Sequence, residues 1–127
     1  MNESLLEYAN QVCGKAGVCC VYYEMDCSES EYNSDLKILH LGLEGEDYKC
    51  DAVVYHEAEH ILQDKRGYLC LRLCQWGIFA EFFRYFTERD ATSRAVKKMK
   101  DHQIYTSLAE NYLRQRLLLY RKKIFAF

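Results

Sequence analysis

The stretch VVYHEAEH, at residues 53–60, contains the pattern His-Glu-x-x-His, and the rest of the chain is interpreted around it. Residues four apart lie on one face of a helix, so His56 and His60 could both reach a single metal ion. Glu57 would then stand beside a water molecule on that ion. At the His and Glu frequencies of this chain, the pattern arises by chance in about one sequence in ninety. The stretch therefore predicts a helical metal site, with a pair of hydrogen-bonded core histidines as the alternative.

Apolar side chains accompany the histidines along the expected helix: Val53, Val54, Ala58, Ile61 and Leu62. They predict that the histidines are buried or line a cleft. The helical pattern starts near residue 48, with Asp51 as the N-cap and Gly67 as the C-terminal stop.

The other elements form an N-terminal helix, a small β-sheet, and two or more helices after the motif. Their expected ranges are a helix over 3–13, strands over 18–25 and 36–43, and helices over 79–101 and 103–122. Gly14 and Gly17 end the first helix, and the polar residues 26–35 form a loop. Alternation in the second strand places Leu39 and Leu41 on one face. This order of elements predicts an α+β fold.

Length and composition indicate one cytoplasmic domain. The 127 residues contain no proline and no linker, so residues 1–127 are expected to form a single domain. Seven cysteines, an odd number without a Cys-x-x-Cys pair, are expected to be free thiols. No apolar run approaches the roughly 18 residues of a membrane span. The N-terminus carries acidic residues where a signal peptide carries basic ones, so a cytoplasmic location is expected.

Charge is distributed unevenly along the chain. Residues 1–51 carry eleven Asp and Glu against three Lys, a net charge of −8, and residues 52–127 carry eight acids against fourteen bases, a net charge of +6. This polarity could steer a charged partner, or it could reflect two solvated faces that complement each other. It does not indicate a nucleic-acid-binding protein, and no direct binding of nucleic acid is expected.

The motif helix supplies only part of a catalytic zinc site. Such a site takes three protein ligands and keeps one position for water. Asp64 continues the row of His56 and His60, but it lies about 12 Å from His56 along the helix axis, too far to share one ion. A third ligand is therefore expected from the second long helix.

Residues 88–95, ERDATSRA, resemble a second motif of the ImmA/IrrE-like (DUF955-type) metallopeptidases. In that family the HExxH motif is followed on a later helix by Glu-x-Glu-Ala-Asp/Asn-x-Phe-Ala. The resemblance extends from about residue 3 to about residue 100 and implies a zincin-like (gluzincin) domain. It implies Glu88 as the third metal ligand beside His56 and His60, with Asp90 and Glu81 as alternatives. The implied cofactor is one Zn²⁺ ion, with Mn²⁺ as an alternative.

Three positions depart from the family pattern. Glu59 stands where the family has glycine, which implies either different helix packing or an exposed Glu59. Thr92 replaces an Asp or Asn that orients a metal ligand, a loss that typically costs about 10- to 100-fold in affinity or activity. Arg94 replaces an apolar phenylalanine.

The resemblance implies a zinc-dependent, site-specific endopeptidase. Glu57 would take the proton of the attacking water and deliver it to the leaving amine. The implied substrate is a helix-turn-helix transcriptional repressor of a phage or mobile element. The alternative is a zincin-fold regulatory protein that acts on a partner by binding, without proteolysis. The side chains available to stabilise the oxyanion include Tyr55, Tyr85, His102 and Tyr105.

Overall fold

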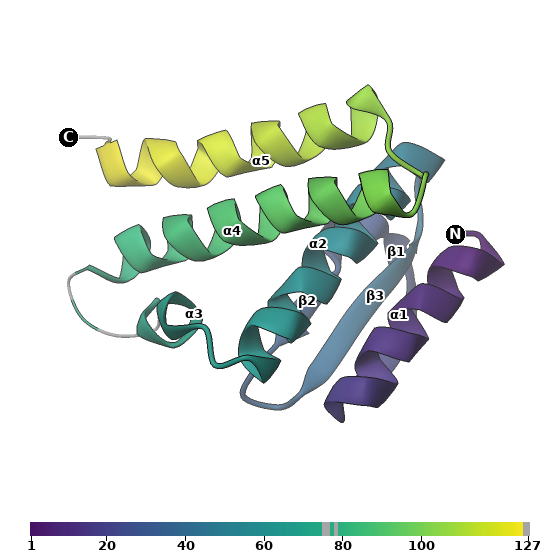
Figure 1. Cartoon of the computed structure of the whole chain (residues 1–127), viewed down its shortest axis with the longest axis horizontal. Helices are drawn as coiled ribbons and strands as arrows, with labels where there is room; N and C mark the ends of the chain where they lie inside the picture. Colours follow the sequence, from purple (N-terminus) through teal and green to yellow (C-terminus); the bar gives the residue numbers. More distant parts are fainter. Residues whose placement is uncertain (75–76, 78, 126–127) are drawn as a thin grey trace.

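The computed structural model describes residues 1–74, 77 and 79–125 (Figure 1). Its first helix, α1 (Glu3–Ala16), begins where the Asn2 side chain accepts a hydrogen bond from the Leu5 amide. It ends at Gly17, whose φ of 69° is the left-handed conformation that glycine adopts at no steric cost. The predicted stop at Gly17 is therefore confirmed, whereas Gly14 lies inside the helix and was wrongly predicted to end it.

Three strands form one sheet in the order β1-β3-β2. The strands β1 (Cys19–Asp26) and β3 (Ile38–Glu44) pair in parallel, and β2 (Glu31–Asn33) pairs with β3 in antiparallel fashion. The two predicted strands are confirmed, but the predicted loop over 26–35 also contains β2 and a 3₁₀ turn, η1 (Cys27–Glu29). β2 has only three residues, too few to show a sequence pattern typical of a strand, so only its pairing with β3 identifies it.

One face of the sheet carries the core. Leu39 and Leu41 of β3 are buried, as the predicted alternation requires, while Ile38 and His40 are half-buried on the other face. Gly42 allows a close approach, because a Cβ atom there would lie 2.4 Å from the carbonyl oxygen of Asp26. The helices α1 and α2 contact each other and pack beside the sheet (Figure 1).

The motif helix, α2 (Asp47–Lys65), is the central helix of the molecule. It begins earlier than predicted, after Glu46, so the prediction of Asp51 as N-cap is wrong. Near its other end Gly67 adopts a φ of 71°, and the Tyr68 amide donates to the Gln63 carbonyl at 2.9 Å, which confirms the predicted stop. Because α1, α4, α5 and the sheet all contact α2, most of its middle residues are buried.

Three helices follow: α3 (Leu69–Leu73), α4 (Ala80–Asp101) and α5 (Ser107–Phe125). α4 matches the predicted range within one residue, whereas α5 starts four residues later than predicted, after a turn in which Gln103 has a φ of 61°. α4 and α5 run antiparallel, side by side (Figure 1). These helices and the small sheet confirm the α+β class. Among the described helices, none has the length and apolar character needed to cross a membrane.

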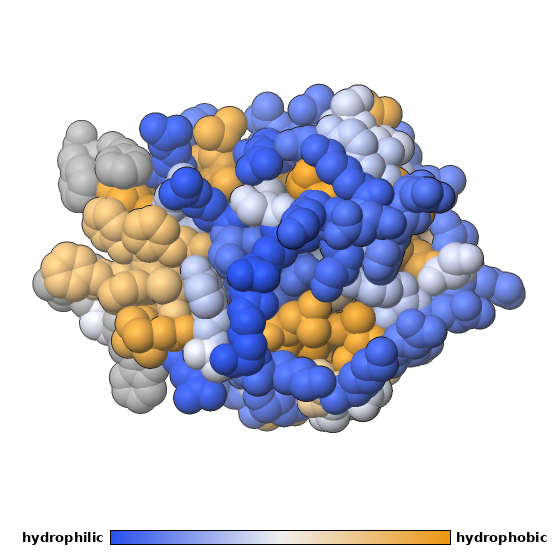
Figure 2. All heavy atoms as spheres, viewed as in Figure 1, coloured by the Kyte–Doolittle hydropathy of each residue, from blue (hydrophilic) through white to orange (hydrophobic). Residues whose placement is uncertain are grey.

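Exposed apolar side chains gather over α3, the start of α4 and the end of α5, on the left in Figure 2. The large ones in these three segments are Leu69, Phe79, Phe82, Phe86, Leu118 and Leu119. This apolar surface therefore lies at the end of the molecule where α4 begins and α5 ends.

Candidate metal centre

The three residues of the motif lie together in the interior of the protein. His56, Glu57 and His60 are 5%, 5% and 7% exposed, as the flanking apolar residues predict. Each offers one potential metal-binding atom, and these atoms lie within 4.8 Å of one another. The helical spacing brings the two imidazole rings to a centroid distance of 4.6 Å. This group could hold a metal ion.

Glu88 reaches the two histidines from α4. Its Oε2 atom lies 2.8 Å from Nε2 of His56 and 3.2 Å from Nε2 of His60. In a tetrahedral zinc site with bonds of about 2.0–2.1 Å, neighbouring ligand atoms lie about 3.3 Å apart. The two distances from Oε2 of Glu88 are close to this separation, so His56, His60 and Glu88 are suited to hold a zinc ion.

In the absence of a metal ion, hydrogen bonds and opposite charges between the protonated histidines and Glu88 hold this cluster together. Burial lowers the pKa of His60, but the Glu88 carboxylate, the charge of Glu57 and the hydrogen bond to Gln63 together outweigh it and raise the pKa to about 10. Burial likewise opposes a charge on Glu88, yet the positive His60 and the hydrogen bonds from both histidines hold the pKa of this carboxyl well below its usual range. A metal ion that binds here must therefore displace protons from the histidines.

Glu57 is fixed by the edge strand of the sheet. The backbone amide of Tyr32, in β2, donates a hydrogen bond of 3.0 Å to Oε2 of Glu57. Burial opposes ionisation, but the nearby His56 imidazole and the charge of His60 lower the pKa of Glu57. The side chain is therefore a carboxylate at neutral pH and can accept a proton.

The outer nitrogen of His60 belongs to a network that links α2 to α4. Nδ1 of His60 lies 2.7 Å from Oε1 of Gln63, whose Nε2 donates to the Thr87 carbonyl and to Oδ2 of Asp90, both at 2.9 Å. The Thr87 carbonyl and the Asp90 carboxylate only accept hydrogen bonds, so the NH2 group of Gln63 must face them. Nδ1 of His60 therefore donates to the carbonyl oxygen of Gln63. Nε2 of His60 is left to bind a metal.

The outer nitrogen of His56 has no such partner. Within the described residues, Nδ1 of His56 is buried without a hydrogen bond, and Oε1 of Glu57 is 3.6 Å away, too far for one. The two metal-binding histidines therefore differ in their support.

A cleft of about 470 Å³ opens over the motif. Residues 28–35 form one wall. Helical segments form the other, with Leu71 from α3, Cys74 just after it, Arg84 and Glu88 from α4, and Arg116 and Tyr120 from α5. The sequence patterns did not single out Arg84, Arg116 or Tyr120. Their only signal is helical spacing, since Arg84 precedes Glu88 by four residues and Arg116 precedes Tyr120 by four.

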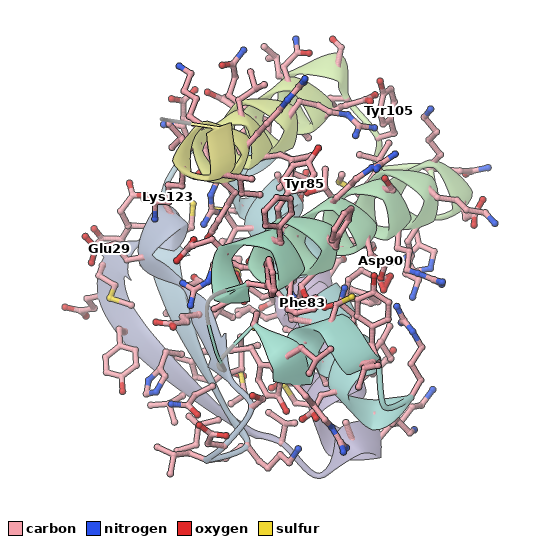
Figure 3. All side chains as sticks on the ribbon, turned by 90° about the vertical axis from the view of Figure 1, so that its left-hand side faces the viewer. Glu29, Phe83, Tyr85, Asp90, Tyr105 and Lys123 are labelled. Atoms are coloured by element: carbon pink, nitrogen blue, oxygen red, sulfur yellow. The ribbon has the colours of Figure 1, made fainter. Side chains whose placement is uncertain are left out.

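The alternative ligands lie elsewhere. Oxygen atoms of Asp90 accept hydrogen bonds from Gln63, from Arg66 at 2.6 Å and from Arg94 at 3.0 Å. Figure 3 shows Asp90 on the side of α4 away from α5. Glu81 is exposed in the first turn of α4. Of the predicted acidic ligands, the structure brings only Glu88 to the histidines.

The predicted oxyanion-stabilising residues also lie apart from the cleft. Tyr55 and His102 share a hydrogen bond of 2.7 Å between Oη and Nδ1, and Tyr105 donates to Glu110. Tyr85 lies between α4 and α5 in Figure 3, and it is not among the residues that line the cleft. Tyr120 lines it instead.

The departures from the family pattern have structural consequences. Glu59 is buried rather than exposed, and its carboxylate pairs with Nζ of Lys98 at 3.1 Å. Thr92 is also buried, whereas Arg94 is exposed and pairs with Asp90.

Comparisons of the chain with protein-family models, curated proteins and solved structures find no match. The function is therefore inferred from the site itself and from the two short motifs.

Proposed function

We propose that this chain is a zinc-dependent, site-specific endopeptidase with a zincin-like (gluzincin) fold. The observation that carries the proposal is the convergence of Nε2 of His56, Nε2 of His60 and Oε2 of Glu88 beside the Glu57 carboxylate. A buried structural cluster has no need of a cleft, yet these residues line one that is open to a substrate. The resemblance to ImmA/IrrE-like metallopeptidases supports the same function.

Zinc held by His56, His60 and Glu88 would acidify a water molecule and polarise the scissile carbonyl. Glu57 is the general base, because it lies next to the ligands and is ionised at neutral pH. The hydrogen bond from the Tyr32 amide holds its Oε2 atom, so one carboxylate oxygen is fixed while the proton is taken. The protonated Glu57 then delivers that proton to the leaving amine.

Tyr120 is suited to stabilise the negative charge that develops on the scissile carbonyl oxygen. Burial, and then the charge of Glu88, raise the pKa of its phenol to about 12, so the hydroxyl keeps its proton at neutral pH. The side chain lines the same cleft as the motif residues, from α5. A protonated phenol at this position can donate a hydrogen bond to the carbonyl oxygen.

The proposed substrate is a transcriptional repressor of the helix-turn-helix type. This part of the proposal rests on the family resemblance alone. The alternative, a regulatory protein that binds its partner without cleaving it, is favoured by the unpartnered Nδ1 of His56, since metal-binding histidines almost always have a partner for the second nitrogen.

The variant Glu57→Gln separates the two functions. It leaves His56, His60 and Glu88 intact, so bound zinc should remain, while cleavage should fall by at least about 10²-fold because the base is lost. Zinc-loaded protein would be incubated with a host-cell extract, and new peptide termini would be counted by mass spectrometry. Termini that appear with the wild type and vanish with the variant support the peptidase. The same termini with both proteins, or none with either, contradict it.

A further inference from the structure

The two walls of the cleft carry opposite charges. Residues 28–35 contribute Glu29, Glu31 and Asp35. The helical wall contributes Arg84 and Arg116 beside Glu88, whose carboxylate is paired with the two histidines. Two arginines therefore face the space in which a substrate would lie.

Both arginines lie one helical turn from groups of the site. Arg84 precedes Glu88 by four residues in α4, and Arg116 precedes Tyr120 by four residues in α5, so each pair shares one face of its helix. Arg84, Arg116 and Tyr120 line the same cleft, and the charges of Arg116 and Arg84 each lower the pKa of Tyr120. Lys123 adds a third positive charge, with Nζ 5.6 Å from the centre of the Tyr120 ring. In Figure 3, Lys123 lies on the same flank of the molecule as Glu29.

Among the residues that the structure describes, neither arginine has a carboxylate partner. Within the described part of the chain, Arg66, Arg94 and Arg114 each form a salt bridge, but Arg84 and Arg116 form none. Glu88 does not serve as a partner, because its Oε2 atom is held by the two histidines.

The environment of Arg116 is the strongest sign of a missing ligand. Its Nη1 atom is shielded from solvent and has no hydrogen-bond partner among the described residues. A buried donor without an acceptor is costly, and it is costlier for a charged group. The guanidinium lies 5.7 Å from the centre of the Tyr112 ring, a contact that favours the cation but offers no acceptor to its N–H groups.

We propose that Arg84 and Arg116 form a subsite for a carboxylate of the substrate, next to the bond that is cleaved. The inference rests on the proposed function, because it assigns a substrate group to the same cleft. A guanidinium binds a carboxylate through two parallel hydrogen bonds, which would satisfy the buried donor of Arg116. The carboxylate comes either from an acidic side chain within the substrate or from the C-terminus of a peptide. The acidic wall at Glu29, Glu31 and Asp35 repels a carboxylate, so the carboxylate should bind on the helical side of the cleft.

Nuclear magnetic resonance tests this subsite without any cleavage. The protein would be titrated with N-acetylglutamic acid α-amide, which carries a side-chain carboxylate, and with N-acetylalanine, which carries a terminal one. The neutral controls are N-acetylglutamine α-amide and N-acetylalanine amide. At least one carboxylate should shift the Nε–Hε resonances of Arg84 and Arg116, and the neutral compounds should leave them unchanged. Whichever carboxylate binds more tightly identifies the source.

Matched variants show whether these two arginines are responsible. Arg84→Gln and Arg116→Gln should each weaken carboxylate binding by roughly tenfold. Arg114→Gln removes an exposed arginine of α5 that pairs with Glu110, and it should leave the affinity unchanged. Because Arg84 is exposed, its variant should fold even if the Arg116 variant does not.

The result is independent of whether the protein is a peptidase. Absence of shifts with both carboxylates overturns the inference, whatever the cleavage assay gives. Binding that persists at full strength in Arg84→Gln and Arg116→Gln also overturns it, because a metal ion or another site then holds the carboxylate.

Discussion

The two histidines of the motif lie one turn apart on the same helix, yet their outer nitrogens have different environments. Nδ1 of His60 donates to Gln63, which is in turn held by Thr87 and Asp90 of α4. Nδ1 of His56 is buried without a hydrogen bond. The inner nitrogens of both rings meet the same Glu88 oxygen.

This difference shows that helix periodicity brings the two metal ligands together, whereas other side chains orient them. Helix periodicity alone places His56 and His60 on one face, so both rings share an inner partner. An outer partner requires a further side chain in the right place, and only His60 has one. We therefore expect His60 to be the better oriented of the two metal ligands, and His56 to depend more on the metal itself.

The largest expected effect is on the pH dependence of zinc binding. The pKa of about 10 means that the metal-free protein holds a proton on His60 at neutral pH, and zinc must displace it. Affinity should therefore rise with pH, by roughly tenfold per pH unit for each displaced proton, between about pH 6.5 and 8. Calorimetry in buffers of different ionisation enthalpy counts the released protons. A pH-independent affinity with no proton release would contradict this description of the metal-free cluster.

The variant Gln63→Leu tests the network behind His60. Leucine has a similar volume but is apolar and cannot accept the Nδ1 proton, so the imidazole loses its fixed orientation. Zinc affinity should fall by about 10- to 100-fold. Competition with a chelating dye would measure it, with Gln115→Leu, at an exposed position of α5, as the control. An unchanged affinity would show that the two histidines are equivalent despite their different contacts.

Asp90→Asn should have a smaller effect of the same kind. Asp90 contacts Gln63 and two arginines but neither histidine, so it orients His60 only through Gln63. Zinc affinity is expected to fall only a few-fold, less than in Gln63→Leu. A loss as large as that of Glu88→Ala, measured with the same dye, would mean that Asp90 itself binds the metal.

The sequence predicted the parts of the site that depend on local periodicity. His56, Glu57 and His60 share a helix, and the apolar residues around them indicated burial, which the structure confirms. Gln63 could have been found in the same way, because it lies three residues after His60. The predicted N-cap at Asp51 failed because tertiary packing extends α2 by a turn beyond it.

Residues that approach from distant segments could not be predicted from periodicity. Tyr120 and Arg116 reach the cleft because α5 packs along α4, and no local pattern encodes that contact. The edge strand β2, which fixes Glu57 through Tyr32, is too short for a pattern of its own. Glu88 was placed by a resemblance between motifs, and its role as a metal ligand stays a prediction.

The metal content of the purified protein, measured beside that of Glu88→Ala, tests the central claim most directly. Elemental analysis should find close to one zinc or manganese ion per chain in the wild type, and little or none in the variant, with circular dichroism to confirm that the variant is folded. That result would establish a three-ligand site made of His56, His60 and Glu88. An absence of metal from the wild type, even after zinc is supplied, would contradict the proposed peptidase and leave a protein that acts by binding.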